Sequence, residues 1–189
     1  MITISPDNKT DREIGASWAS GGTLLGKVFI PLTRYLRARQ GLSVIKGTES
    51  HLDMGCGDCY FLLNSPCKKR IGLDMRFGDD LNKGGLDFPD DSFDNVSMIA
   101  VIEHLEEPKR IVKEIARILK PGGHFIVTTP LEKGEWIMKL LKKDISEIHE
   151  EYYGPSEMRS LVEGSLELKV FRKFLFGFNQ LFVMEKPAK

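Results

Sequence analysis

The sequence has no run of 18 apolar residues, no excess of either charge and only three cysteines. Without such a run, no transmembrane helix is expected. The 27 basic residues balance the 27 acidic ones, so no net field would draw the chain to nucleic acid or an anionic bilayer. An odd number of cysteines, bunched at Cys56, Cys59 and Cys67, makes a poor disulfide framework and suits a reducing compartment.

The amino-terminal stretch lacks a secretory signal, because Asp7, Asp11 and Glu13 occur there and no apolar run precedes them. The cysteine usage and the missing signal together predict a cytoplasmic protein. At 189 residues, the chain is long enough for one domain that buries roughly 70% of its unfolded surface, and short for two. Residues 1–13 are polar, and we expect them to be loosely held.

The stretch His51–Asp58 reads His-Leu-Asp-Met-Gly-Cys-Gly-Asp. An apolar run that ends in a carboxylate, followed by two glycines one residue apart, is typical of a buried parallel strand entering a tight turn beneath a nucleotide-like ligand. Gly55 and Gly57 allow the backbone to turn sharply and to approach a ligand where a Cβ would collide. We therefore predict a strand at about 50–54 and a ligand-binding turn directly after it.

A second apolar run ends in Asp74, 17 residues after Gly57. A carboxylate at that position can accept hydrogen bonds from two ribose hydroxyls. Between the two runs, a short helix must end near Ser65, because Pro66 follows it. Strand, glycine turn, short helix, a strand at about 70–75 and the acid together predict one βαβ unit for an adenosine-containing ligand.

From Thr23 onward, apolar residues recur at helical spacing and basic residues occupy other positions. This pattern predicts an amphipathic helix that is kinked or split at Pro31. Such a helix can pack on the core of the domain, cover the ligand as a lid, or lie on a membrane surface. We expect no peripheral membrane contact, although the third alternative would provide one.

The rest of the chain alternates strands and helices, which predicts a parallel sheet with right-handed crossovers. Two β runs at 166–176 and 180–185 predict a closing antiparallel hairpin. Residues 76–85 are polar where many folds of this kind place a further helix and strand, so we expect a vestigial edge strand there. The other expected elements are strands at 95–101 and 125–129 and helices at 106–119, at 135–143 and from Gly154 onward.

Several patterns in this order resemble the class I S-adenosylmethionine-dependent methyltransferases, a large family that includes small-molecule, lipid and quinone methyltransferases. The resemblance covers about residues 50–186. It implies a Rossmann-like α/β fold, in which helices cover both faces of a mostly parallel seven-stranded sheet with a carboxy-terminal antiparallel hairpin. The patterns are Leu52–Gly57, Asp74, Leu86–Asp94, Glu103–Leu105, Ile115–Gly123 and Gly177–Val183.

The resemblance also implies a division of the chain. Residues 1–47 would be an amino-terminal segment that carries the lid or packing helix. Residues 48–189 would be the methyltransferase domain, with residues 131–165 inserted as a substrate cap.

The resemblance implies S-adenosylmethionine as the cofactor. Asp53 would orient the turn and the amino-acid end of the cofactor, Asp74 would hold the ribose, and Met75 would lie against the adenine. Asn82 would reach the adenine amine, and Cys59 replaces a glycine that is common in the family, which loosens the approach of the following helix. The residues assigned to this site are Asp53, Gly55, Cys56, Gly57, Asp74, Met75, Asn82, Ala100 and Val101.

No catalytic dyad is evident, and the chemistry explains why. A sulfonium methyl is already electrophilic, so alignment of the acceptor and exclusion of water can supply most of the catalysis. A base is needed only when the acceptor must lose a proton. Glu103 and His104 could supply one, and family analogy places His149 and Tyr153 near the substrate, but structural roles stay open for all four. His104, His149 and Tyr153 are therefore candidates, the catalytic residue is unassigned, and no metal ion is expected.

Two other classes of protein stay open. A nicotinamide-dependent oxidoreductase would also use a glycine turn and Asp74, but Tyr60 stands where its Gly-x-Gly-x-x-Gly motif needs glycine. A non-catalytic binding protein would keep the fold without the reaction. Cys56 and Cys59 would suit a metal or redox pair, but no second pair lies nearby. Zero net charge and the lack of an Asn-Pro-Pro-Tyr-like segment favour a small or lipid-like acceptor over nucleic acid.

Overall fold

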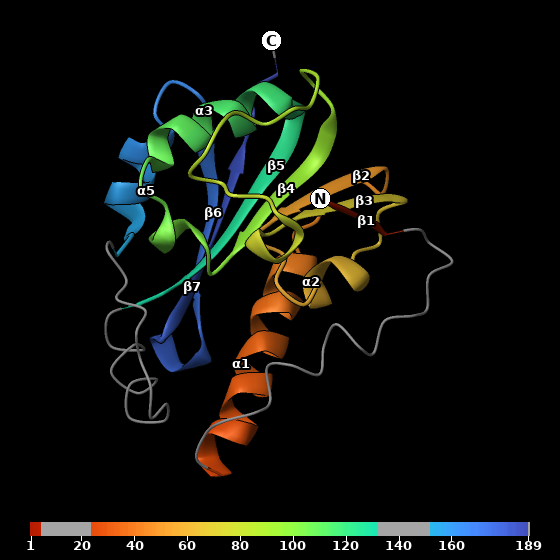
Figure 1. Cartoon of the computed structure of the whole chain (residues 1–189). Coiled ribbons are helices and arrows are strands. Elements are labelled where there is room, and N and C mark those ends of the chain that lie inside the picture. Colours follow the sequence, from red (N-terminus) through yellow and green to blue (C-terminus); the bar gives the residue numbers. More distant parts are fainter. Residues whose placement is uncertain (5–23, 132–151, 189) are drawn as a thin grey trace.

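The computed structural model describes residues 1–4, 24–131 and 152–188 (Figure 1). Its strands are β1 (Ile2–Ile4), β2 (Ser50–Met54), β3 (Lys69–Leu73), β4 (Phe93–Ile99), β5 (Leu119–Pro130), β6 (Glu167–Phe174) and β7 (Asn179–Glu185). Its helices are α1 (Leu24–Leu42), α2 (Tyr60–Leu63), α3 (Pro108–Ile118) and α5 (Pro155–Val162), and short 3-10 turns are η2 (Met75–Phe77), η3 (Ile102–His104) and η4 (Leu175–Gly177).

Within the described residues, the strands form one seven-stranded sheet in the order β1-β3-β2-β4-β5-β7-β6. The pairs β2–β3, β2–β4 and β4–β5 are parallel, whereas β7 runs antiparallel to both β5 and β6. This arrangement confirms the predicted Rossmann-like α/β fold with its antiparallel hairpin. It also brings the carboxyl ends of β2, β3, β4 and β5 to one edge of the sheet, where ligands bind in folds of this kind.

The prediction that residues 1–13 are loosely held is wrong for its first part. Ile2–Ile4 forms the edge strand β1 and pairs antiparallel with β3, with Ile2 opposite Gly72. The sequence analysis missed this strand because three residues are too few to show an alternating pattern. Apolar packing explains it, since Ile4 is buried in a cluster with Cys56, Cys59 and Leu62.

The segment that follows β3 contains no strand between Arg76 and Ser92, as the prediction of a vestigial edge strand requires. Side chains of α3 hold this polar segment instead. Arg110 donates to the carbonyls of Leu81 and Asn82, at 3.2 and 3.1 Å. Arg117 donates to the carbonyls of Leu86 and Phe88 in the same way. Two arginines thus satisfy backbone carbonyls that a strand would otherwise have paired.

The helix was predicted to be kinked or split at Pro31. Helix α1 runs from Leu24 to Leu42 with Pro31 inside it, so the split does not occur, and the kink stays a prediction. Pro31 is exposed, and water can therefore satisfy the carbonyl that loses its helical donor. The helix contacts α2 and the strands β4, β5 and β7. Figure 1 shows its amino-terminal half projecting beyond the sheet.

The opposite face of the sheet is covered by α3 and α5, as Figure 1 shows. Pro108 occupies the first turn of α3, where its missing N–H costs nothing. The largest core cluster joins the buried faces of these two helices to the sheet, so the predicted helices on both faces are present. Its members on α3 and α5 are Ile111, Val112, Ile115, Ile118, Met158, Leu161 and Val162.

Several predicted elements end at slightly different residues, and some lie outside the described part of the chain. The second strand ends at Leu73, so Met75 belongs to η2, and the strand predicted at 95–101 is Phe93–Ile99. The helix predicted at 135–143 and most of the cap at 131–165 fall outside the described residues. No described helix is both long and apolar enough to cross a membrane. The division of the chain at residue 47 stays a prediction.

The pairing of β1 with β3 depends on a glycine. A Cβ added to Gly72 would lie 2.6 Å from Cys56 Sγ and 2.9 Å from Ile2 Cγ2. We expect Gly72→Ala to lower the free energy of unfolding in urea by about 1–3 kcal/mol, because overpacking forces neighbours apart. Gly85→Ala is the matched control, since its Cβ would meet nothing closer than 3.6 Å. Equal stability of the two variants would contradict the packing of β1.

Candidate functional site

The predicted glycine turn follows β2 at the carboxyl edge of the sheet, and its two glycines have different surroundings. Both have positive φ, +74° at Gly55 and +54° at Gly57. A Cβ at Gly55 would lie 2.4 Å from Val101 Cγ2, so the protein's own packing requires glycine there. A Cβ at Gly57 would meet nothing within 4 Å. The turn is therefore packed against protein at Gly55 and open at Gly57, where a ligand can approach the backbone.

The acid that ends the second apolar run is bound to this turn. Asp74 Oδ2 accepts a hydrogen bond from the Gly57 amide at 2.8 Å, and Oδ1 accepts one from the Arg76 amide at 3.0 Å. The side chain is half-buried. Each carboxylate oxygen can accept a further bond, so two hydroxyl groups can still be accommodated. Beside it, the Met75 side chain is 76% exposed, which offers an apolar surface to a flat ligand.

Beneath the turn, four buried side chains form a hydrogen-bonded row. Ser97 Oγ donates to Asp53 Oδ1 at 2.6 Å, so its oxygen accepts from His51 Nε2 at 2.8 Å. His51 Nδ1 is then the acceptor for Ser65 Oγ at 2.9 Å. Because one ring nitrogen of His51 donates and the other accepts, the imidazole is neutral. Burial and the nearby charge of Arg70 agree with this, since they lower the pKa of His51 to about 3. The row holds Asp53 in one orientation.

Asp53 itself is almost fully buried, and burial raises its pKa to about 7. The hydrogen bond from Ser97 opposes this rise, while the negative charges of Asp74 and Asp58 add to it. A carboxyl group in this setting changes charge near neutral pH, which is common at functional sites.

Helix α1 reaches this site through Arg34. The guanidinium forms an ion pair with Asp58 and lies 4.5 Å from the centre of the Tyr60 ring. Both contacts are with the turn and the start of α2. The packing of α1 on the sheet agrees with the first of the three predicted alternatives, and a lid role stays a prediction. Both interactions were missed in the sequence, where Arg34 is one of several basic residues on an amphipathic helix.

The other predicted cofactor residues lie along the same edge. Ala100 has a positive φ of 58°, and its amide donates to the Thr128 carbonyl at 2.8 Å. Val101 is the residue that fills the space beside Gly55. Asn82 Oδ1, predicted to reach an adenine amine, already accepts from the Glu106 amide at 3.1 Å. Its contact with a ligand stays a prediction and would need the second lone pair of that oxygen.

The two cysteines of the turn are structural neighbours. Their Sγ atoms lie 3.5 Å apart, both side chains are buried, and both are free thiols. Cys59 occupies the left-handed region, with φ of 57°, at the start of α2. A glycine, which the family resemblance places at this position, would adopt this conformation without strain. Among the described residues, no group of three potential ligands could hold a metal ion.

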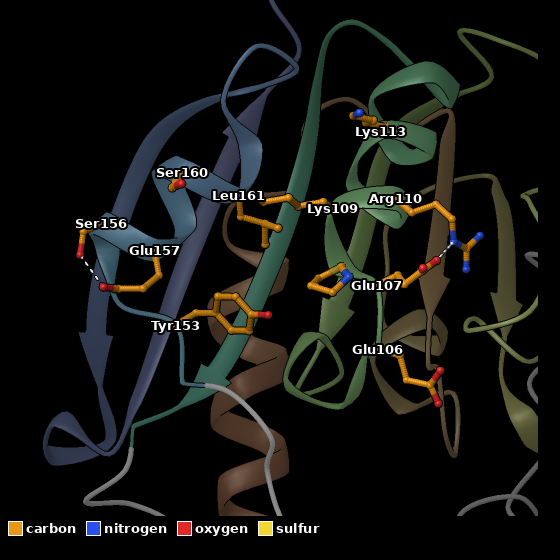
Figure 2. Close-up of a pocket in the computed structure, with 11 residues that line it drawn as sticks. Glu106, Glu107, Lys109, Arg110, Lys113, Tyr153, Ser156, Glu157, Ser160 and Leu161 are labelled. Atoms are coloured by element: carbon orange, nitrogen blue, oxygen red, sulfur yellow. Dashed lines mark hydrogen bonds and ion pairs between the residues drawn. The ribbon is translucent and has the colours of Figure 1, made fainter.

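The structure describes two of the three candidate catalytic residues, and these two lie in different surroundings. His104 is exposed on η3, and Tyr153 is buried in the core beside α5. His149 lies outside the described residues. An open groove of about 910 Å³ runs between α3 and α5 and includes Tyr153 (Figure 2). None of the residues predicted to bind the cofactor lines this groove, so it is separate from the glycine turn.

Glu103, the neighbour of His104, is buried, whereas His104 is exposed. Glu103 is 2% exposed, and both carboxylate oxygens lack a hydrogen-bond partner within the described ranges. Burial raises its pKa to about 7, although its own amide, the charge of Arg37 and the Thr129 hydroxyl each act to lower it. In the sequence, Glu103 was singled out only as a possible base beside His104, and its burial left no local signal.

A mixed sheet whose central strands are parallel, an open glycine turn and an acid bound to that turn are the features of a Rossmann-like α/β protein that binds a nucleotide-type ligand. Comparison with known proteins defines the class further. A family model described as "Methyltransferase domain" matches residues 28–165, which is most of the chain. The chain belongs to this family. Membership confirms the predicted class, the S-adenosylmethionine-dependent methyltransferases, and its cofactor.

Relatives with curated names support the same class. A probable S-adenosylmethionine-dependent methyltransferase of Mycolicibacterium smegmatis is 36% identical over 98 residues, which are 42% of this chain and 37% of that protein. A phosphatidylethanolamine N-methyltransferase of Cereibacter sphaeroides is 30% identical, over 32% of this chain and 30% of its own. A ubiquinone biosynthesis O-methyltransferase of Acinetobacter baylyi is also 30% identical, over 41% of this chain and 37% of that protein. The chain thus spans about a third of the length of these relatives.

Solved structures show the fold. A methyltransferase of Haloferax volcanii, solved in complex with the activator Trm112, aligns with a TM-score of 0.65. The alignment covers 82% of this chain and 91% of that one at 21% identity. At this level of identity, the likeness concerns the fold alone.

The buried Asp53 predicts a pH dependence of stability. Its pKa is about 7 in the folded protein and 3.8 in its ordinary state, so between these values the folded protein binds more protons than the unfolded chain. Raising the pH through this window therefore lowers the free energy of unfolding. Between about pH 5 and about pH 7, the free energy of unfolding of the wild type should fall, relative to that of Asp53→Asn, by up to about 1.4 kcal/mol per pH unit.

Urea unfolding of both proteins at several pH values measures this difference. Glu103 titrates in the same range, but it is present in both proteins and its contribution cancels. A stability difference that stays constant with pH would show that Asp53 titrates normally.

Proposed function

We propose that the chain binds S-adenosylmethionine over the glycine turn and transfers its methyl group to a small or lipid-like acceptor by in-line displacement. The observation that carries this proposal is the hydrogen bond between the Gly57 amide and Asp74 Oδ2, which joins an open turn to a carboxylate with unused acceptor capacity. The predicted cofactor residues keep the roles assigned to them above as part of this proposal.

The residues present fit such a cofactor in three respects. Gly57 has space above it that a Cβ would partly fill. Asp74 can accept from two further hydroxyls, as a ribose requires. Met75 presents an exposed thioether chain, and sulfur packs favourably against aromatic rings such as adenine.

The cofactor, when bound, supplies an electrophilic methyl group on a sulfonium. The chain's own residues then have to position the acceptor and exclude water. Arg34 fastens α1 over the turn through Asp58 and Tyr60, so this helix can shield that part of the site. Gly55 and Val101 fill the space beneath, which leaves the upper side of the turn as the approach for ligands.

The acceptor class rests on the names of the relatives and on charge. One relative is named for phosphatidylethanolamine and another for ubiquinone biosynthesis. The balanced net charge gives no general attraction to nucleic acid. We also propose a cytoplasmic location, since buried free thiols at Cys56, Cys59 and Cys67 suit a reducing compartment.

Calorimetric titration with S-adenosylmethionine, S-adenosylhomocysteine and NAD tests the proposal. Binding of the first two without NAD is the expected result. Binding of NAD alone would favour an oxidoreductase, and the absence of all binding would favour a protein that keeps the fold without the reaction.

Asp74→Ala should weaken binding of S-adenosylmethionine by about 1.5–3 kcal/mol, or about 10- to 150-fold in Kd, through loss of charge-assisted hydrogen bonds. Calorimetry measures the change. Asp87→Ala is a matched control, because Asp87 is exposed and lies apart from the turn. An unchanged Kd for Asp74→Ala would remove this residue from the site.

A further inference from the structure

Buried polar side chains without partners gather at the carboxyl edge of β4 and β5. Both oxygens of Glu103 belong to this group, together with the hydroxyl of Thr129 and Oε1 of Gln180, none of which has a hydrogen-bond partner of normal geometry within the described ranges. The Thr129 hydroxyl is near enough to Glu103 to lower the pKa of that carboxyl. Thr129 lies opposite Gln180 on β7, so the two side chains share one face of the sheet. Buried polar groups are normally paired, so such a cluster indicates a place where a ligand supplies the partners.

A cation acts on this cluster from α1. The half-buried Arg37 donates Nε to Asn179 Oδ1 at 2.7 Å, and its positive charge lowers the pKa of Glu103 against the effect of burial. Arg37 and Glu103 nevertheless form no direct ion pair in the described structure. From β5 and β7, only the neutral Thr129 and Gln180 belong to the cluster. The carboxylate thus has a compensating charge nearby and free acceptor positions.

The cluster adjoins the proposed cofactor site. Glu103 follows Val101 by two residues, and Val101 fills the space beside Gly55 of the turn. The family resemblance implies that Ala100 and Val101 line the methionine portion of the cofactor, which carries the transferred methyl group. The inference that follows rests on that proposed function.

We propose that Glu103 is a catalytic residue that binds the acceptor through its nucleophilic O–H or N–H group and removes the proton. The acceptor is therefore a protic nucleophile, a hydroxyl compound or an amine. Arg37 is a positioning residue that keeps the carboxylate ionised.

The lone pair of the acceptor oxygen or nitrogen forms a bond to the methyl carbon, and the carbon–sulfur bond breaks with its electron pair returning to sulfur. The O–H or N–H proton passes to a carboxylate oxygen of Glu103 and leaves to water after the product departs. A base of this kind works best with a pKa near the working pH, and the pKa of Glu103 is about 7.

The test uses the full chain with tritiated methyl groups on S-adenosylmethionine and three probes. Catechol offers a hydroxyl, phosphatidylethanolamine vesicles offer an amine, and nicotinamide offers a ring nitrogen that carries no proton. We expect transfer to catechol or to the vesicles, and the arm that responds identifies the source of the protic group. Calorimetric binding of the responding probe provides a second readout that does not depend on turnover.

Glu103→Gln keeps the shape of the side chain and removes the base. We expect kcat for the protic probe to fall about 100-fold, in line with the usual contribution of a general base. The affinity for S-adenosylmethionine should stay unchanged, which also shows that the variant folds. Glu163→Gln is the matched control, because Glu163 is exposed and lies apart from the site.

Arg37→Gln tests whether the charge of Arg37 acts on Glu103 or whether Arg37 only stabilises the fold. The variant keeps a donor for Asn179 and removes the charge. Without that charge, the pKa of Glu103 rises, so the acid limb of the pH–rate profile should move to higher pH. A merely structural role would lower the rate without moving the limb.

Three results would overturn the inference. The first is an unchanged kcat for Glu103→Gln, and the second is transfer to nicotinamide alone. The third is a wild type that binds S-adenosylmethionine but methylates neither protic probe. Failure of the wild type to bind S-adenosylmethionine would instead contradict the proposed function, so the two failures can be told apart.

Discussion

One hydrogen bond holds the candidate site together, that between the Gly57 amide and Asp74 Oδ2 at 2.8 Å. It connects the end of β2 to the end of β3, two strands that already pair in parallel. Because the carboxylate also caps η2 through the Arg76 amide, the same side chain sets the direction of the chain after β3. The open turn, the acid and the exposed Met75 are therefore placed as one unit, and a ligand meets a surface that needs little rearrangement.

The chain maintains two carboxyl groups at a cost to its stability. Asp53 and Glu103 are both buried, and burial raises the pKa of each to about 7. Their surroundings differ, however, since a serine hydroxyl donates to Asp53, whereas Glu103 has no partner within the described ranges. An acid that a buried hydroxyl holds in one orientation suits a fixed position beneath the turn. An unpaired one suits contact with a molecule that arrives later, and such sites commonly trade stability for function.

Local sequence patterns predicted much of the sheet because they carry their own physical signal. The bounds of β2 agreed fully, and the glycine turn, α3 and the closing hairpin were recognised from their glycines, prolines and apolar spacing. The strand β1 was missed because its three residues show no alternating pattern and only its pairing with the distant β3 identifies it. Arg34 and Arg37 were missed for a similar reason, since their partners Asp58 and Asn179 belong to distant elements. Long-range contacts between polar groups leave no local pattern to detect.

The edge strand β1 also bears on the order in which the molecule assembles. Ile2 pairs with Gly72, so this strand cannot settle until the whole first βαβ unit has been synthesised and folded. Closing such a large loop carries an entropic cost that a three-residue strand repays only weakly. We expect the edge to form late and to open first in the native state, as elements with few contacts do in hydrogen exchange. The strands β2 and β3 beneath the ligand site would then be protected from hydrogen exchange, while β1 at the edge of the sheet would exchange most readily.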